Sequence, residues 1–518
     1  MRDDEHSVDI SNVMQMTASL TSRHAATDPM ITVCGVVLLG TAVVLFVGYN
    51  LIGGRGPFYL YAALLSTYLF FECRFHLRKQ MSYGALAPPL IATLYYFFLS
   101  HVLSAGVSMI DPYIYERLSN VVPDVWSKCS EFIPLAALAA FAMWRGFDLA
   151  ATQGNLLRRS LQKAHMVRTE WNPNFPAALV LQICSIAVVI YGIANGIFGM
   201  AGSVEAREQH VMILQFFGIA VSSGGLSLLL MLVELFDGLK RGRPVQLVMI
   251  AGLSAFVIQL GIGLLSGFKF QVVFPFLVAG LAYFLVYRRI AWTLAGMAGV
   301  ALVVSYSVIE PYRAYLNRQQ LYGQGVDTLL HAIVDGTRQR DDLVSANVPL
   351  STQIASRLDM TAMSIAGVDF ADQEGVDSEM KGAMVNSILL APVYAFVPRA
   401  VWKDKPSFST GVWYNQNVFG NTSDSGTSVG MGPITYFYMI GGGWGVGIGF
   451  LILGYLQGFV FYGIARSGAG GMLVYIGSAM TLATLPSDVG PALAGAIQLL
   501  PIMFVAQYIL LRPVVRKG

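Results

Sequence analysis

The amino-acid sequence predicts an all-α polytopic membrane protein with about twelve transmembrane helices. Of its 518 residues, 55% are hydrophobic and only 12% are charged, and the mean hydropathy is +0.59. A soluble globular protein of this length does not normally have such a composition. In addition, apolar segments of roughly 16 to 25 residues recur along the chain, and this length crosses about 30 Å of hydrocarbon as a helix.

The expected transmembrane segments form two groups separated by a polar region. The first group of nine lies near residues 31–52, 57–72, 86–107, 132–150, 177–199, 211–236, 245–266, 270–287 and 290–309. The second group lies near residues 434–463, 471–486 and 490–511. Segment 132–150 is unusual because Arg145 and Asp148 lie at its end.

Lysine and arginine sort the short connections into two sets, and connections rich in these residues stay in the cytoplasm. The cation-rich connections follow the second, fourth, sixth and eighth segments and contain Arg74, Arg78, Lys79, Arg158, Arg159, Lys163, Arg168, Lys240, Arg241, Arg243, Arg288 and Arg289. The alternate connections are poor in cations. We therefore expect a cytoplasmic N-terminus and an outer location for residues 310 onward.

Segment 384–401 is apolar, but it is not expected to cross the membrane. The last cations of the chain are expected in the cytoplasm; they are Arg466 and those of the tail 512–518. If segment 384–401 crossed the membrane, these cations would lie on the outer side instead. Pro392 and Pro398 also oppose an uninterrupted helix. The segment is therefore predicted to be re-entrant or surface-lying, beside a cavity, since irregular backbone at membrane depth needs protein or water around it.

These expectations divide the chain into five regions. They are a disordered cytoplasmic tail (1–28), a first transmembrane bundle of about nine helices (29–309), an outer loop region that contains segment 384–401 (310–433), the C-terminal transmembrane helices (434–511) and a cytoplasmic tail (512–518). Both termini are thus expected in the cytoplasm.

The outer region begins as an acidic lobe, because residues 310–383 hold eleven Asp and Glu against six Lys and Arg. Residues 345–368 have an apolar stripe at helical spacing, with Ser351 or Thr352 as the expected N-cap. Residues 407–430 are rich in Ser, Thr, Asn and Gly with interleaved aromatic residues, which fits a glycan-binding loop and equally a polar loop with interfacial anchors. The glycines from Gly441 to Gly449 favour close helix packing.

The composition also excludes several classes. The basic residues occur in twos and threes at the ends of apolar segments, which does not suggest nucleic-acid binding. The four cysteines form no disulfide framework or zinc spacing. No metal-binding carboxylate pair is apparent, so neither a metal nor another cofactor is expected.

Residues 354 to 463 resemble the Wzy-type oligosaccharide repeat-unit polymerases of O-antigen and exopolysaccharide assembly. The resemblance rests on Arg357-Leu358-Asp359, on the string PRAVWKDKP from Pro398 to Pro406, on the Gly/Ser/Thr-rich loop and on the glycine-rich helix start after Tyr436. One departure is that Thr435 precedes Tyr436, where the family often has an acidic residue.

The resemblance implies a GT-C-like membrane glycosyltransferase of the bacterial inner membrane that polymerises undecaprenyl-diphosphate-linked repeat units at the outer face. The catalytic candidates are Arg399, Arg357 and Asp359, and the substrate-binding candidates are Lys403, Lys405, Trp402, Trp413, Tyr414 and Tyr436. Guanidinium and ammonium groups suit a diphosphate leaving group, and they make a metal-free mechanism feasible. The implied partners are the lipid-linked glycans, membrane lipids, and a chain-length regulator and flippase of the same pathway.

Two other functions are alternatives. An O-antigen-ligase-like glycosyltransferase would share the donor and the cations. A lipid-linked oligosaccharide transporter would have internal repeats and broken helices in matched halves, whereas this sequence shows no convincing repeat and concentrates its polar residues in one outer lobe. The general base is open between Asp359, Asp404 and His331. His101 is a lone titratable group within the third segment, which suggests either a functional role or a hydrogen bond to backbone or headgroup.

Overall fold

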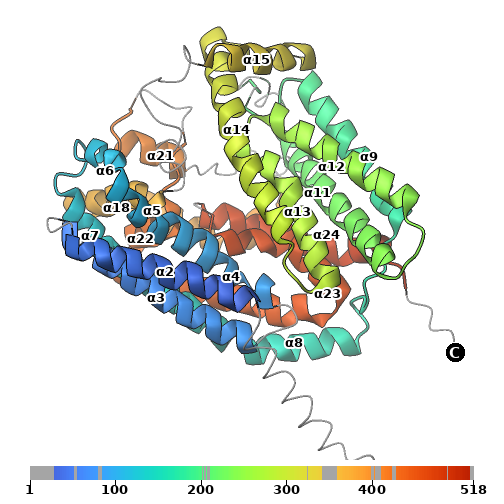
Figure 1. Cartoon of the computed structure of the whole chain (residues 1–518), viewed down its shortest axis with the longest axis horizontal. Helices are drawn as coiled ribbons and strands as arrows, with labels where there is room; N and C mark the ends of the chain where they lie inside the picture. Colours follow the sequence, from blue (N-terminus) through green and yellow to red (C-terminus); the bar gives the residue numbers. More distant parts are fainter. Residues whose placement is uncertain are drawn as a thin grey trace, which may run out of the picture.

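The computed structural model describes residues 29–51, 55–79, 84–200, 202–203, 206, 210–323, 325–340, 359–397, 402, 410–422, 428–486 and 488–513. These residues form helices and connections (Figure 1). Within these ranges the β-structure consists of one isolated antiparallel bridge between Pro173 and Leu511. The predicted all-α class is confirmed.

In the described part of the chain, ten helices are long and apolar enough to cross a membrane. They are α2 (Pro29–Leu51), the continuous stretch of α4 (Pro88–Ala92), η3 (Thr93–Val102) and α5 (Leu103–Ile110), α7 (Val125–Leu149), α9 (Phe175–Ala194), α11 (Val211–Lys240), α12 (Gln246–Ser266), α13 (Lys269–Tyr287), α14 (Trp292–Gln319), α22 (Gly432–Gly463) and α24 (Val489–Leu510). The chain is therefore a polytopic membrane protein.

The other two expected segments differ from these ten helices. Segment 57–72 lies in α3 (Gly56–Lys79), a 24-residue helix whose second half carries several charged side chains. Segment 471–486 is divided among α23 (Ala469–Val474), the π-helical η5 (Tyr475–Ala479) and the 3₁₀-helical η6 (Met480–Thr484). Together these three make one shorter apolar stretch.

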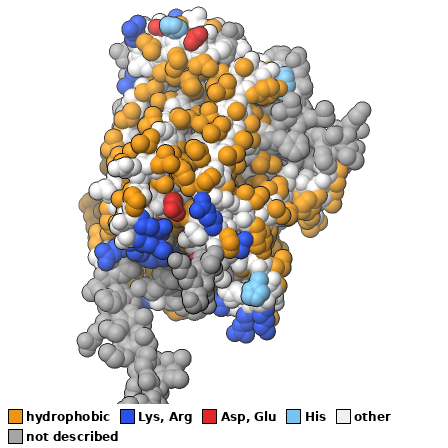
Figure 2. All heavy atoms as spheres, turned by 90° about the vertical axis from the view of Figure 1, so that its right-hand side faces the viewer, with side chains coloured by type: hydrophobic (Ala, Val, Ile, Leu, Met, Phe, Trp, Pro, Cys, Tyr) orange, Lys and Arg blue, Asp and Glu red, His pale blue; other side chains and the backbone are white. Residues whose placement is uncertain are grey.

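The helices form two groups (Figure 1). In the first, α7 packs along α22, while α3 packs against α2 and α7. The second contains α9 and α11 to α14, with α15 (Val326–Arg338) packed on α14. Helix α24 contacts α9 and thereby joins the groups. Figure 2 shows the face of the second group as a broad hydrophobic surface with charged side chains toward its margins, as a lipid-facing surface requires.

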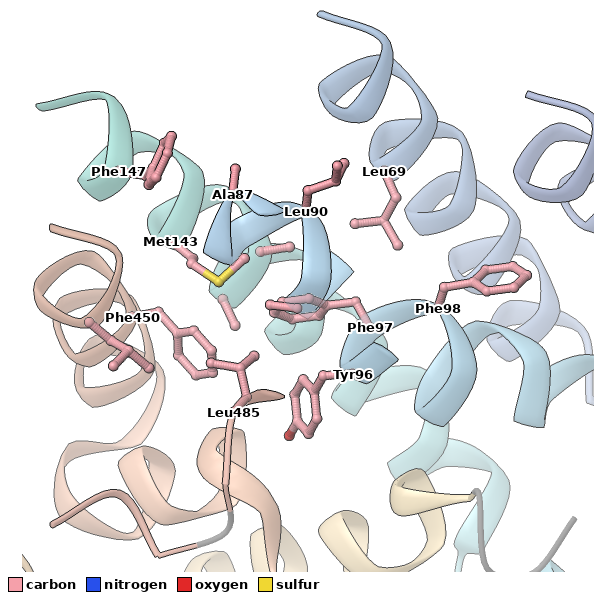
Figure 3. Packing of buried hydrophobic residues seen from close by; sticks show 14 of the residues in the cluster. Leu69, Ala87, Leu90, Tyr96, Phe97, Phe98, Met143, Phe147, Phe450 and Leu485 are labelled. Atoms are coloured by element: carbon pink, nitrogen blue, oxygen red, sulfur yellow. The ribbon is translucent and has the colours of Figure 1, made fainter. Parts of the chain in front are cut away.

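The largest hydrophobic cluster lies in the first group. Figure 3 shows aromatic residues of η3 beside residues of α7 and α22. The ring centroids of Phe97 and Phe450 are 6.1 Å apart, and both side chains are fully buried. Leu485, in the connection after η6, joins the same cluster. This packing holds the irregular backbone of 475–486 against protein, where it is tolerated.

Helix α18 (Met360–Gln373) corrects the expected helix at 345–368. Its N-cap is Asp359, whose Oδ1 accepts hydrogen bonds from the backbone N–H groups of Thr361 and Ala362 at 2.8 and 3.2 Å. An aspartate that satisfies these free N–H groups starts a helix strongly. The helix also continues to Gln373, beyond the expected end. The expected caps Ser351 and Thr352 lie outside the described residues.

The apolar segment that begins at residue 384 covers the second half of one short helix and the whole of another. Helix α19 (Ser378–Leu389) has 12 residues and α20 (Ala391–Phe396) has 6, with the break at Leu390 just before Pro392. At 1.5 Å per residue, neither helix approaches the roughly 30 Å needed for a crossing. Both helices pack against α24.

Helix α22 bends where the glycine run begins. Gly442 has a φ of +59°, which glycine adopts without strain, and Gly441 is also non-helical. A Cβ at Gly445 or Gly449 would lie 2.2 or 2.4 Å from Phe437. These contacts lie within α22, across its bend, so the two glycines let the helix fold back on its own first turns. At Gly443 and Gly447 the nearest atoms belong to Leu135 and Leu138 of α7, at 3.8 and 3.9 Å.

Candidate functional site

Asp359 lies in a buried polar cluster at the start of α18. The residue is 3% exposed, and Tyr115 of α6 (Tyr113–Leu118) and Ser104 of α5 lie beside its carboxylate. Burial raises the pKa of Asp359 to about 6, while the two capping N–H groups and the hydroxyls of Tyr115 and Ser104 oppose that rise. In turn, burial and the nearby Asp359 raise the pKa of Tyr115. The cluster is shielded from solvent.

His101 joins this cluster through Thr361. The Nδ1 atom of His101 lies 2.9 Å from the Thr361 hydroxyl, and both residues are fully buried. The Thr361 hydroxyl also donates to the Ser100 carbonyl at 3.2 Å. The His101 Nε2 atom is buried and has no hydrogen-bond partner among the described residues. The suspected intramembrane histidine is therefore bonded to a side chain of α18.

A second polar cluster joins three elements around Tyr436. The Tyr436 hydroxyl donates to the Met384 carbonyl at 2.7 Å and lies 2.8 Å from the Ser387 hydroxyl of α19. Asp488, the N-cap residue of α24, is close enough to act electrostatically on Tyr436. Its Oδ1 atom is buried without a hydrogen-bond partner in the described part of the structure, and burial raises the pKa of its carboxyl.

The predicted aromatic residues of the outer loop are packed against α18. Helix α21 (Thr410–Asn417) holds Tyr414, which is fully buried and donates to the Met363 carbonyl. Trp413 is half-buried, with its ring edge-on to Phe370 at 5.9 Å between centroids. Tyr436 is fully buried as well. Their observed contacts are with protein, so a direct contact with a sugar stays a prediction.

The predicted cations Arg357, Arg399, Lys403 and Lys405 lie outside the described residues, as does Asp404. Trp402 is described within that stretch. Its ring lies 5.8 Å from the ring of Tyr394, centroid to centroid, so it contacts α20. His331, another candidate base, is exposed on α15.

A cluster of charged side chains between α3 and α7 was not predicted from the sequence. Arg145 of α7 pairs with Glu72 of α3, and the Tyr68 hydroxyl donates to Glu72 at 3.0 Å. His76 Nε2 lies 3.5 Å from Glu72 and 3.7 Å from Asp148. The charges at the end of segment 132–150 are thus held by partners on α3.

Helix α18 is the element that brings the predicted residues together. Asp359 caps it, Tyr414 bonds to its Met363 carbonyl, and Thr435, beside Tyr436, donates to its Ser364 carbonyl at 3.2 Å. Sequence reasoning missed Asp488 and Ser387. Asp488 had a signal, because it is the only Asp or Glu after Asp424 in the chain.

The residues described by the structure include no group of three or more His, Cys, Asp or Glu side chains that could hold a metal ion. The polar clusters around Asp359 and Tyr436 instead combine one carboxylate with hydroxyl groups. Such a set can bind hydroxyl-bearing ligands and accept a proton.

The fold and these clusters define an all-α polytopic membrane protein with buried polar groups between its helices. Residues 177–480 match the family described as a domain of unknown function (DUF8712). Because the match covers more than half of the chain, the protein belongs to that family. No curated protein and no solved structure matches the chain.

Proposed function

We propose that the protein is a glycosyltransferase that joins polyprenyl-diphosphate-linked oligosaccharide units at the outer face of the bacterial inner membrane. The observation that carries the proposal is the broken helix pair α19–α20, which leads directly into the cation-rich stretch Arg399 to Lys405. Neither helix is long enough to cross by itself, and the proposal takes the pair to be re-entrant, with both of its ends on one side of the membrane.

The cations of this stretch suit the proposed donor. When the anomeric carbon–oxygen bond breaks, the lipid diphosphate leaves with the electron pair and gains negative charge. Arginine binds such phosphate oxygens through two parallel hydrogen bonds, and lysine adds a point charge. Arg399, Lys403 and Lys405 fill these roles, and Trp402 anchors the stretch against Tyr394 of α20.

The acceptor sugar loses a proton when its hydroxyl attacks the anomeric carbon, so the reaction needs a base. Asp488 suits this role better than Asp359, because Asp359 is 3% exposed and already caps α18 through Oδ1. The Asp488 Oδ1 atom has no such hydrogen bond among the described residues. A carboxyl with a raised pKa is also a stronger base once ionised. The proton taken from the acceptor passes to Asp488 and then to water.

The proposal includes the topology, with a GT-C-like arrangement of twelve crossings. The cation-rich connections share one side only if α3 and the stretch 469–486 also cross. Helix α3 has 24 residues and the length to do so, and its partners Arg145 and Asp148 on α7 compensate its charged end.

Purified protein incubated with synthetic polyprenyl-diphosphate repeat units tests the proposal. The expected product is a ladder of oligomers that persists in chelator. Arg399→Ala is expected to abolish the ladder, while Lys381→Ala, which removes an exposed cation from α19, is expected to retain it. A wild-type protein that moves these lipids across liposomes without forming bonds would instead be a transporter. Transfer to a different acceptor only would indicate a ligase.

A further inference from the structure

Two arginines that lie close together carry an inference independent of the proposed glycosyl transfer. Arg158 belongs to α8 (Ala151–Lys163), and Arg466 belongs to η4 (Ala465–Ser467), the turn that follows α22. Arg158 lies on the same face of α8 as Gly154 and Gln162, four residues from each. This face packs on Tyr462 and Ser467, which flank Arg466, so the two guanidinium groups come near enough to repel each other. Neither makes an ion pair with a carboxylate among the described residues, whose salt bridges all involve other cations.

The fold forces this approach of like charges. Helix α8 lies across the lower end of the first helix group (Figure 1) and contacts both α22 and η4. Gly154 permits the contact, because a Cβ there would lie 2.7 Å from Tyr462. Gln162 Nε2 then donates to the Ser467 carbonyl at 2.9 Å and fixes α8 on η4. This contact keeps the backbones of Arg158 and Arg466 in neighbouring positions.

Both arginine side chains are also partly withdrawn from water. Each residue is half-buried, and the Arg158 Nε atom is buried without a hydrogen-bond partner in the described part of the chain. The Arg466 guanidinium lies over the Tyr462 ring at 5.6 Å. A buried, unsatisfied guanidinium N–H is costly, and an adjacent cation increases that cost. A bound anion would offset the repulsion between the two guanidinium groups and supply acceptors for their terminal N–H groups.

We infer that Arg158 and Arg466 form a binding site for a phosphate group, supplied by the headgroup of an anionic phospholipid. Guanidinium groups bind phosphate oxygens in pairs of parallel hydrogen bonds. The site lies at the end of the apolar helices α7 and α22, where headgroups lie. Leu149 at the end of α7 and Leu156 on α8 are 61% and 57% exposed, so this end of the helix group also has apolar surface for acyl chains.

The test uses the purified full-length protein in neutral detergent, with phosphatidylglycerol, phosphatidylcholine and inorganic phosphate as probes. Native mass spectrometry measures binding, and thermal unfolding measures stabilisation. Phosphatidylglycerol is expected to bind and raise the melting temperature, whereas phosphatidylcholine is not. The double variant Arg158→Gln/Arg466→Gln is expected to weaken phosphatidylglycerol binding roughly 30-fold. Equal protection by inorganic phosphate at the same concentration would support the anion site and assign it to a free phosphate.

Arg159→Gln is the matched control, because Arg159 is the exposed neighbour of Arg158 on the same helix. It removes the same charge and is expected to leave binding within about twofold. If Arg158→Gln and Arg159→Gln weaken phosphatidylglycerol binding equally, the binding depends on general surface charge and the proposed site is wrong. Equal binding of the two phospholipids by the wild-type protein would overturn it without any variant.

Discussion

His101 Nδ1 lies 2.9 Å from the Thr361 hydroxyl, although 260 positions separate the two residues in the chain. The contact joins a transmembrane segment to the first turn of α18, two residues after the buried cap Asp359. Because α18 in turn holds α21 and the start of α22, this hydrogen bond anchors the polar clusters to the membrane bundle.

Thr361→Val is expected to lower the free energy of unfolding by about 1–3 kcal/mol, since it leaves a buried imidazole nitrogen without a partner. Thermal or denaturant unfolding in detergent measures the loss. Thr337→Val is the control, because that exposed hydroxyl bonds only to the Ile333 carbonyl of its own helix. If the two variants lose the same stability, the contact with His101 contributes nothing.

Asp359 makes the stability of the protein depend on pH. Burial raises its pKa from 3.8 to about 6, so between these values the native state binds more protons than the unfolded chain. Stability therefore falls as the pH rises through this window, by about 3 kcal/mol in total. Asp359→Asn keeps a capping oxygen and is expected to remove this slope. Melting temperatures from pH 4 to 7 check the prediction. The control is Asp335→Asn, at a partly exposed position on α15, and this variant is expected to retain the wild-type slope.

Glu72→Gln is expected to destabilise the protein by about 3 kcal/mol, because it leaves Arg145 without its nearest partner inside the helix group. Glu116→Gln breaks the pair between Glu116 and Arg55 near the surface, where the carboxylate oxygen and the guanidinium nitrogen are 3.8 Å apart. This variant is expected to lower the free energy of unfolding by less than about 1 kcal/mol. Thermal unfolding of the two variants side by side gives the comparison. Similar melting temperatures for the two variants would mean that the ion pair between Glu72 and Arg145 is solvated and contributes little to stability.

Gly454→Ala tests the packing of α22 on α7. A Cβ at Gly454 would lie 2.1 Å from the Met143 carbonyl oxygen, which belongs to the backbone and cannot rotate away. We expect a loss of about 2 kcal/mol or more from overpacking, seen as a lower melting temperature and poorer monodispersity. Gly447→Ala on the same helix, with 3.9 Å to its nearest neighbour, is expected to be neutral or stabilising. A larger loss of stability in Gly447→Ala than in Gly454→Ala would contradict the close contact between α22 and α7 at Gly454.

Asp488→Asn is expected to reduce the rate of oligomer formation about 100-fold or more, the usual effect of losing a general base. The asparagine keeps the size of the side chain, so binding of the lipid-linked donor should change little. Initial rates at several pH values separate the two effects, since only a base changes the pH profile. Asp377→Asn on α19 provides a comparison at an exposed helix cap. An unchanged rate and profile in Asp488→Asn would remove Asp488 from the mechanism.

The sequence alone determined the fold class and most of the membrane-crossing elements. Ten of the expected segments correspond to helices with the length and apolarity to cross, because hydropathy is a local property summed over about twenty residues. It also indicated that segment 384–401 is not one helix, since proline acts on its immediate neighbours. The family resemblance stays a prediction, as do the roles of Arg399 and its neighbouring cations.

The tertiary structure decided which polar residues share a site. It gave the predicted Asp359 a capping role in a buried cluster, and it brought the unpredicted Asp488 and Ser387 to Tyr436. It also separated the glycines that touch another part of the protein from those with free space around them. These relationships join residues far apart in the chain, and they depend on the angle at which helices pack. No local pattern of residues encodes that angle, so the sequence predicted the helices but not the contacts between them.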